Sequence, residues 1–329
     1  MSVQHKIVAP EDDGQRLDRW LKKYFPQASI ILIQKTMRKG EIRVNKGRVK
    51  ASTRLKTGDD IRIPPQFMGA EKPQAHKNQT ISAKDRDYIR SLVIYEDEDL
   101  IALNKPAGLA VQGGTNTTRH VDRYLEGLKK KSTDPRPKLV HRLDKDTSGV
   151  LVIAKTPDSA RYLMRLFKDR EIAKTYVAIT VPVPKMKSGQ IRGAIVQSEQ
   201  GGFEKMSVDD TQGKRAVTDF EVLDYLSKTA ALVAFMPRSG RKHQIRVHAS
   251  DVLETPILGD RKYGYDNEGL EGLKLSKGLH LHAYRLQIPL QSGSGFIAIE
   301  APLPENFKNS CGVLGLGLDN LNALSLDRP

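Results

Sequence analysis

Apolar positions in the first 67 residues recur first at helical spacing and then at strand spacing. Residues 17–24 carry apolar side chains three or four positions apart, which predicts an amphipathic helix. Ser29 and Gly40 are a typical N-cap and C-cap, and they predict a second helix between them. Alternation of apolar and polar residues then predicts two short strands, around 42–44 and 61–63. The pattern indicates a small α/β domain over residues 1–67.

The pattern changes after this domain. Residues 68–90 lack clear periodicity and contain few large apolar side chains, so we expect a linker there. One amphipathic helix is predicted after the capping pair Thr156 and Pro157. Strands are expected at residues 150–154, 174–181, 217–225, 229–236 and 296–300. Strands outnumber β-α-β units, which indicates an α+β domain with a mixed, mostly antiparallel sheet over 91–308. Residues 309–329 are expected to be a tail.

Charge narrows the range of partners. The 329 residues include 54 Lys and Arg against 39 Asp and Glu, a net charge of +15. Such an excess indicates a polyanionic partner, with nucleic acid ahead of an anionic membrane. Residues 1–70 hold 15 of the cations and only 7 of the acids. We expect the outer face of the front domain to bind RNA through Lys35, Arg38, Lys39, Arg43, Lys46 and Arg48.

Other features exclude whole classes of protein. No stretch approaches the roughly 20 apolar residues of a membrane span, so no membrane partner is expected. The first residues do not resemble a signal peptide. Cys311 is the one cysteine, which excludes an internal disulfide framework and a cysteine metal cluster. These features predict a cytoplasmic protein.

Several residues could carry chemistry. Histidines 243, 248, 280 and 282 could suggest a metal site, but no HExxH motif is present, so we expect no catalytic metal. Asp144 and Asp146 could suggest a glycosidase pair. Such carboxyls lie on opposing walls of a cleft, about 5–9.5 Å apart, which two side chains of one tight turn seldom do. Asp146 reads as a turn-former, which leaves Asp144 as the acid of chemical interest.

The basic stretch SGRKHQIRVH, residues 239–248, has two readings. It is either a charged strand with a solvated face or a source of cations for an active-site acid. A buried carboxylate stays ionised only if a cation or hydrogen bonds favour its charged form. The residues therefore predict a basic partner for the acid, without deciding which arginine it is.

Taken together, these motifs resemble the RluA-type ribosomal large-subunit pseudouridine synthases. The resemblance runs from about residue 92 to 305 and rests on NKPAGLAVQGG (104–114), HRLDKDTSG (141–149), KTY (174–176), SGRKHQIRVH, PILGDRKYG (256–264) and LHA (281–283). Residues 15–65 resemble the small RNA-binding domain first seen in ribosomal protein S four. The stretch VNKGRVK followed by RIPP is most similar to the RluC subgroup.

The resemblance implies an activity and roles for particular residues. It implies isomerisation of specific uridines in 23S ribosomal RNA, with the target base flipped out and no cofactor. Asp144 would be the nucleophile, Tyr176 would face the uracil and Arg241 would pair with the aspartate. His141 and Arg142 would contact RNA, with Arg142 entering the vacated stack. We expect a monomer.

Two alternatives remain open. The target could be transfer RNA or other ribosomal uridines, because RNA recognition depends on shape and splayed loops. The chain could also be a non-catalytic RNA-binding ribosome-assembly factor. Asp144, Tyr176 and Arg241 are all present, which argues against this second alternative.

Overall fold

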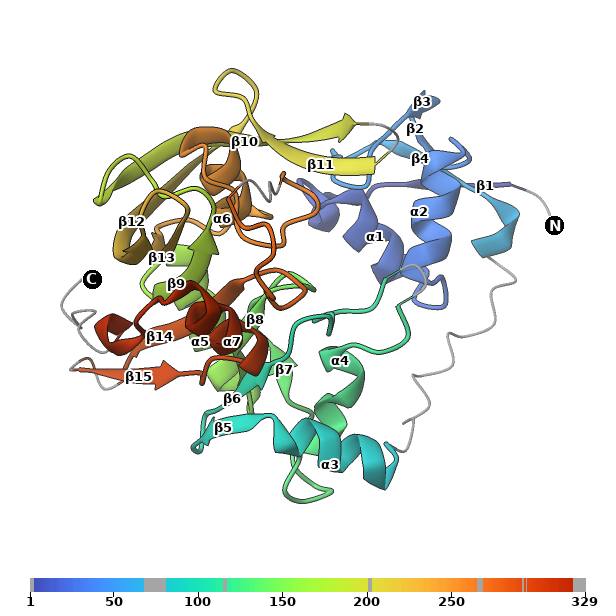
Figure 1. Cartoon of the computed structure of the whole chain (residues 1–329). Coiled ribbons are helices and arrows are strands. Elements are labelled where there is room, and N and C mark those ends of the chain that lie inside the picture. Colours follow the sequence, from blue (N-terminus) through green and yellow to red (C-terminus); the bar gives the residue numbers. More distant parts are fainter. Residues whose placement is uncertain are drawn as a thin grey trace. The chain divides into compact units, whose positions relative to one another are not determined.

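The structure is a computed structural model that describes residues 3–67, 81–114, 117–200, 203–264, 269–291, 293 and 295–321. It divides into two compact units, residues 1–80 and 81–329 (Figure 1). Among the described residues, no helix combines the length and apolar character that crossing a membrane requires.

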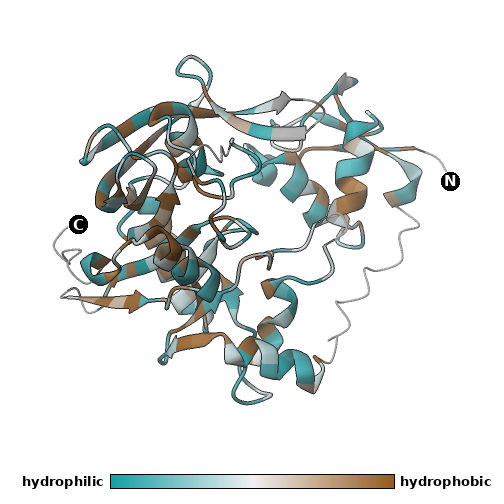
Figure 2. Cartoon of the chain, viewed as in Figure 1, coloured by the Kyte–Doolittle hydropathy of each residue, from teal (hydrophilic) through white to brown (hydrophobic). Residues whose placement is uncertain are grey.

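The front unit packs two helices against a small antiparallel sheet. The helices are α1 (Leu17–Tyr24) and α2 (Ile30–Arg38), with single turns at Pro10–Asp12 and Pro65–Phe67. The sheet has the order β1 (Gln4–Ile7), β4 (Asp60–Ile63), β2 (Arg43–Val44) and β3 (Gly47–Arg48). The predicted caps are present: Ser29 accepts from the backbone N–H of Leu32, and Gly40 has a φ of +70°. Hydrophobic and hydrophilic residues share the same helices (Figure 2), because one face of each is buried.

The core of this unit is built around Trp20, which is fully buried on α1. Its indole N–H donates to the buried carboxylate of Asp12 over 3.1 Å, and that carboxylate also accepts from Lys23 and Tyr24. The four alternating residues of the predicted strands all point into the core: Ile42, Val44, Ile61 and Ile63. The predicted elements of this unit are confirmed.

The second unit is built on an eleven-stranded sheet that is antiparallel except at one pair of neighbours. Its order is β11 (Phe203–Val208), β10 (Ser188–Gln200), β12 (Lys214–Leu226), β13 (Ala230–Pro237), β9 (Ala173–Thr180), β14 (Leu281–Pro289), β8 (Ser148–Ala154), β6 (Leu100–Lys105) and β5 (Val93–Glu96). Strands β15 (Phe296–Glu300) and β7 (Lys138–Leu139) pair with β14 and β8. Only β14 and β8 are parallel. The mixed, mostly antiparallel sheet is thus confirmed.

Helices cover both faces of this sheet. They are α3 (Ala83–Ser91), α4 (Val121–Tyr124), α5 (Pro157–Asp169), α6 (Gln244–Val247) and α7 (Glu305–Leu314). Alternate residues of β8 enter two different cores, as period-two side chains must. Leu151 packs with α3 and α4, whereas Val152 packs with α5. Every residue of β8 is buried, so the strand is a rigid support for the turn that precedes it.

The expected linker and tail differ from the structure. Residues 83–90 of the expected linker lie in α3, whose Ile89 is fully buried in the second unit; residues 68–80 lie outside the described part of the chain. Residues 309–314 of the expected tail belong to α7, where Cys311 and Leu314 are buried. Residues 322–329 are outside the described part. Long-range packing, which local periodicity does not reveal, orders both segments.

Candidate active site

The signature turn leads directly into β8. The backbone N–H of Thr147 donates to the carbonyl of Asp144 over 3.2 Å, which closes the turn. Gly149 follows with a φ of +112°, and a Cβ there would lie 2.2 Å from the carbonyl oxygen of Ala283. Only glycine permits so close an approach, so β8 starts against β14 and Asp144 stands at the end of a buried strand.

Strand β14 brings the turn and Tyr176 together. Ala283 pairs with Gly149 on one side and with Tyr176 of β9 on the other. His282 strengthens the junction, since its Nδ1 lies 2.8 Å from the Ser148 hydroxyl and its Nε2 lies 3.1 Å from the Ala301 carbonyl. The LHA motif therefore begins the strand that lies between the signature turn and Tyr176, two segments about 30 residues apart in the sequence.

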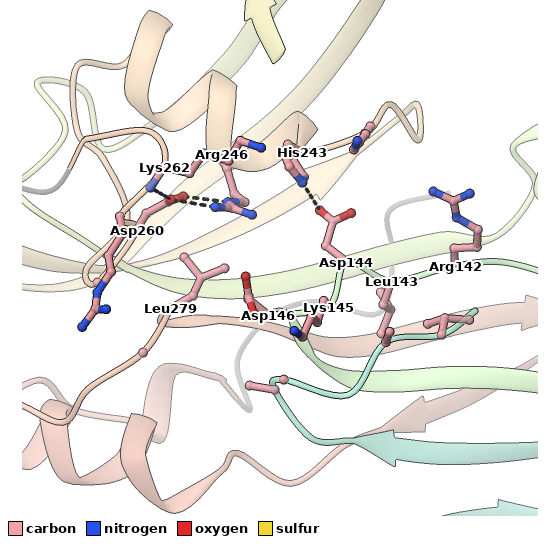
Figure 3. Close-up of a pocket in the computed structure, with 18 of the residues that line it drawn as sticks. Arg142, Leu143, Asp144, Lys145, Asp146, His243, Arg246, Asp260, Lys262 and Leu279 are labelled. Atoms are coloured by element: carbon pink, nitrogen blue, oxygen red, sulfur yellow. Dashed lines mark hydrogen bonds and ion pairs between the residues drawn. The ribbon is translucent and has the colours of Figure 1, made fainter. Parts of the chain in front are cut away.

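Two cavities, of about 880 and 630 Å³, share a wall that carries Asp144. The side chain of Asp144 is 29% exposed, so it is open to a ligand from the cleft. The residues that line both cavities are Arg142, Leu143, Asp144, Lys242, His243 and Arg246. Figure 3 shows His243 and Arg246 reaching toward the turn from the side of α6.

The smaller cavity contains Tyr176 and a surplus of cations. Burial, reinforced by the charge of Asp144, raises the pKa of the half-buried Tyr176, which keeps its phenol neutral. Among the residues lining this cavity, Asp144 is the only acid. Lys174 has a lowered pKa because it is buried and lies near Arg170, and it forms no ion pair with the described residues. An aromatic ring beside unneutralised cations suits a base and its phosphate.

Among the described residues no arginine forms an ion pair with Asp144, so the expected pair with Arg241 is absent; the charge of Asp144 acts instead on Arg246, which lines both cavities with it. Arg246 is 5% exposed and forms two bonds of 2.7 Å with Asp260. Although burial works against its charge, Asp260 and, less strongly, Asp144 raise the pKa of Arg246. Arg241 lines the smaller cavity but lies beyond ion-pair distance of Asp144; its Nε lies 3.5 Å from the Arg215 carbonyl.

The reason is local conformation. Residues 239–248 do not form a strand: α6 begins at Gln244 and continues in a π-helical turn, His248–Val252. His243 directly precedes α6 and Arg246 lies within it, and both line the two cavities, whereas Arg241 lies in the loop before them. With only four residues in α6, the sequence offers no readable helical period that would have selected Arg246.

Lys105, which sequence reasoning missed, supports the signature turn that carries Asp144. Its side chain is fully buried, and its ammonium donates to the carbonyls of Pro106, Leu109 and Lys145 over 2.9–3.1 Å. Burial lowers the pKa of Lys105 to about 8, against the opposing charges of Asp146 and Asp144. The NKPAG motif thus holds the turn in place through a buried cation.

The two other predicted residues of the turn have different surroundings. Nε2 of His141 accepts the backbone N–H of Val152 over 2.8 Å, and its ring stacks on Phe167 at 4.3 Å. Burial lowers the pKa of His141 to about 3, so it is a neutral structural acceptor at the cavity wall. Arg142 is exposed and forms no hydrogen bond or ion pair with the described residues. Figure 3 shows Arg142 on the opposite side of Asp144 from the Arg246–Asp260 pair.

The predicted cations of the front unit are exposed, as expected: Lys35, Arg38, Lys39, Arg43, Lys46 and Arg48. Arg43 pairs across the sheet with Arg48 on one side and Arg62 on the other. Like charges directly opposite each other destabilise a sheet. An anionic partner would relieve this repulsion.

The histidines considered as metal ligands have protein partners. His248 bonds Thr218, while His280 bonds Ser310 and the Leu258 carbonyl; both rings are fully buried. Within the described residues, no group of three or more potential metal ligands comes together.

Comparison with known proteins finds a matching family for each of the two units. The RNA pseudouridylate synthase family matches residues 99–251, and the S4 domain matches residues 15–61. "Ribosomal large subunit pseudouridine synthase C" of Rickettsia conorii is 38% identical over 89% of this chain and 95% of its own length. The protein of the same name from Salmonella typhi is 32% identical over 95% of this chain and 97% of its own.

A solved structure agrees with these relatives. The structure titled "Human RNA Pseudouridylate Synthase Domain Containing 4" matches with a TM-score of 0.60 and 31% identity. It covers 70% of this chain and 97% of the human chain.

Proposed function

Because the chain belongs to the RNA pseudouridylate synthase family, we propose that it converts uridines of 23S large-subunit ribosomal RNA to pseudouridine, with Asp144 as the nucleophile. The names of its relatives in Rickettsia and Salmonella support the substrate. The single observation that carries the catalytic assignment is the cleft in which Asp144 lies with Tyr176 and Arg246.

The target nucleotide must first leave the RNA stack. Flipping costs roughly a few kcal/mol, which interactions with the enzyme must offset. Arg142 stands at the cleft with a guanidinium that has no partner among the described residues. A planar guanidinium stacks well on bases, so Arg142 fills the place that the flipped base leaves.

The flipped nucleotide then occupies the smaller cavity. Its uracil lies against the neutral ring of Tyr176, and its phosphates lie near the cations of the rim, among them Arg170 and Lys174. Placing Lys174 beside a phosphate provides the counter-charge that this half-buried ammonium lacks among the described residues.

The chemistry needs one nucleophilic anion in this basic cleft. Arg246, held by Asp260, places a fixed positive charge on the wall of the cleft that carries Asp144, and the carboxylate of Asp144 acts covalently. The bond between N1 and the ribose breaks, the uracil rotates, and its C5 forms the new bond to the ribose. The hydrogen on C5 leaves to solvent and N1 gains one, so the product is an isomer. The proposal therefore includes no cofactor and no metal.

The front unit contributes affinity for RNA and directs the enzyme to its target. Its exposed cations, including the facing pair Arg43 and Arg48, form a surface for RNA phosphates. The proposal is completed by a monomeric enzyme in the cytoplasm, where its one cysteine, buried in α7, remains a free thiol.

Tritium release tests this function. Large-subunit ribosomal RNA fragments labelled at C5 of uridine should release tritium when the chain is added, and transfer RNA labelled in the same way should not. Pseudouridine maps of ribosomal RNA from cells with and without the gene would identify the sites. Tritium release from transfer RNA alone would show that transfer RNA, and not ribosomal RNA, is the substrate. Release from neither RNA, with RNA still bound, would support a non-catalytic assembly factor.

A further inference from the structure

His243 has an unusual backbone conformation for its residue type. It lies immediately before α6 with a φ of +55°, in the left-handed region that favours glycine. A side chain in this region is costly, and such strain persists where the surroundings enforce it, often at functional sites. The conformation points the imidazole into the cleft, where 11% of the side chain is exposed.

The two ring nitrogens face different partners. Nδ1 lies 2.5 Å from the Tyr263 hydroxyl, and the two rings meet edge to face at 5.4 Å. Nε2 lies 3.9 Å from a carboxylate oxygen of Asp144, which Figure 3 marks with a dashed line. His243 therefore connects the nucleophile to a tyrosine of the DRKYG segment.

The hydrogen bonds of Tyr263 favour one tautomer of His243. The phenol oxygen accepts the backbone N–H of Met206 over 3.2 Å, so its own proton is free to be donated to Nδ1 of His243. Burial raises the pKa of Tyr263 to about 12, which keeps that proton on the phenol. Nδ1 is then the acceptor, and the proton of the neutral ring resides on Nε2, facing Asp144.

The ring stays neutral although it faces an acid. Burial lowers the pKa of His243, and the cations of Arg246, Lys262 and Lys242 act in the same direction, against the charge of Asp144. His243 consequently offers the carboxylate a directional N–H rather than a second positive charge, which Arg246 already provides.

We propose that His243 is a positioning residue whose Nε2–H orients the carboxylate of Asp144, and that Tyr263 fixes the required tautomer. The inference rests on the proposed function of Asp144. The gap of 3.9 Å closes when RNA fills the cleft, as catalytic hydrogen bonds commonly tighten in the substrate complex. A neutral donor sets the direction of the carboxylate without quenching its charge.

Nitrogen NMR of the full chain, labelled with ¹⁵N-histidine, reads the tautomer directly. We expect His243, assigned by loss of its signals in His243→Gln, to show a protonated Nε2 and an unprotonated Nδ1. Tyr263→Phe should mix the tautomers, and Asp144→Asn should shift the Nε2 resonance. Protonation on Nδ1, or an Nε2 resonance that Asp144→Asn leaves unmoved, overturns the proposal. These spectra need no turnover, so they remain decisive even if the proposed activity fails.

Single-turnover rates test the consequence. Losing one oriented donor costs about 10²-fold in rate, so His243→Ala should slow tritium release by about that factor without weakening RNA binding. His243→Gln, whose amide can donate from a similar position, should recover part of the loss. Tyr162→Phe is the matched control for Tyr263→Phe, because its hydroxyl bonds the Pro289 carbonyl. Wild-type rates in His243→Ala and Tyr263→Phe would overturn the positioning role.

Discussion

The front unit and the second unit are both rich in cations, but they hold them in opposite ways. The cations of the front unit stand exposed, with Arg43 opposite two other arginines in its sheet. The second unit also has exposed cations at its cleft, such as Arg142, but it encloses two others: Lys105 is fully buried, and the buried Arg246 bonds a buried Asp260.

The difference separates affinity from chemistry. Exposed charges attract a polyanion, but they are screened by salt and hold no fixed direction. Buried charges in fixed hydrogen bonds can favour one ionisation state and one orientation of a reacting group. We therefore expect changes in the front unit to alter binding, and changes around Asp144 to alter rate.

Among changes to the cations, the largest effect should come from Arg246→Lys, which keeps the charge but loses the two-pronged contact with Asp260. A bond to a charged group contributes about 1.5–3 kcal/mol, so the single-turnover rate should fall roughly tenfold to a hundredfold. Arg241→Lys is the matched control and should have little effect on rate. Equal losses in the two variants would return Arg241 to the catalytic role.

Lowering the pH should reduce the folding stability of the second unit, because the folded state holds His141 neutral. Its folded pKa is about 3 and its unfolded pKa about 6.5, so the unfolded chain binds more protons between these values. Stability is present in full above pH 6.5 and falls as the pH drops; at pH 5 the loss is about 2 kcal/mol.

Denaturant unfolding at pH 7 and pH 5 measures this loss. His141→Gln can still accept the N–H of Val152, so it should reduce the pH dependence by that amount. An unaltered pH dependence in His141→Gln would show that His141 is not held neutral.

The smallest effect should follow removal of charge from the front unit. If Arg43 and Arg48 each contact one phosphate of single-stranded RNA, the double change to Gln should make the fall of log K with log salt shallower. The slope should lose about 1.4 of its magnitude. The rate at saturating RNA should stay the same in this double variant. It should also stay the same in the matched control Arg54→Gln, which removes an arginine that bonds the Gly14 carbonyl. A fall in the saturated rate with an unchanged salt slope would contradict the division of roles.

Sequence alone predicted what local pattern encodes. Caps and alternation predicted the front unit, and short apolar runs predicted several strands of the large sheet: β8, β9, β12, β13 and β15. The motifs selected Asp144 and Tyr176, which the structure brings to one cavity. Their proximity depends on β14, a strand more than 100 residues further along the chain, so no local pattern could predict it.

The errors also have physical causes. The residues alone could not decide which arginine of segment 239–248 interacts with the acid. The resemblance assigned that role to Arg241, whereas the charge of Asp144 acts on Arg246 of α6. In the sequence Lys105 resembles an ordinary surface lysine. The structure shows that it is buried, with its ammonium bonded to three carbonyls. Helix α7 extends into the expected tail, and its order comes from long-range packing, as when Ser310 bonds His280.

Asp144→Asn tests the central claim most directly, measured side by side for tritium release from uridine-labelled large-subunit RNA and for RNA binding. The account predicts RNA affinity like that of the wild type and a rate lower by at least about 10³-fold, because an amide is no nucleophile. Tritium release near the wild-type rate would contradict it.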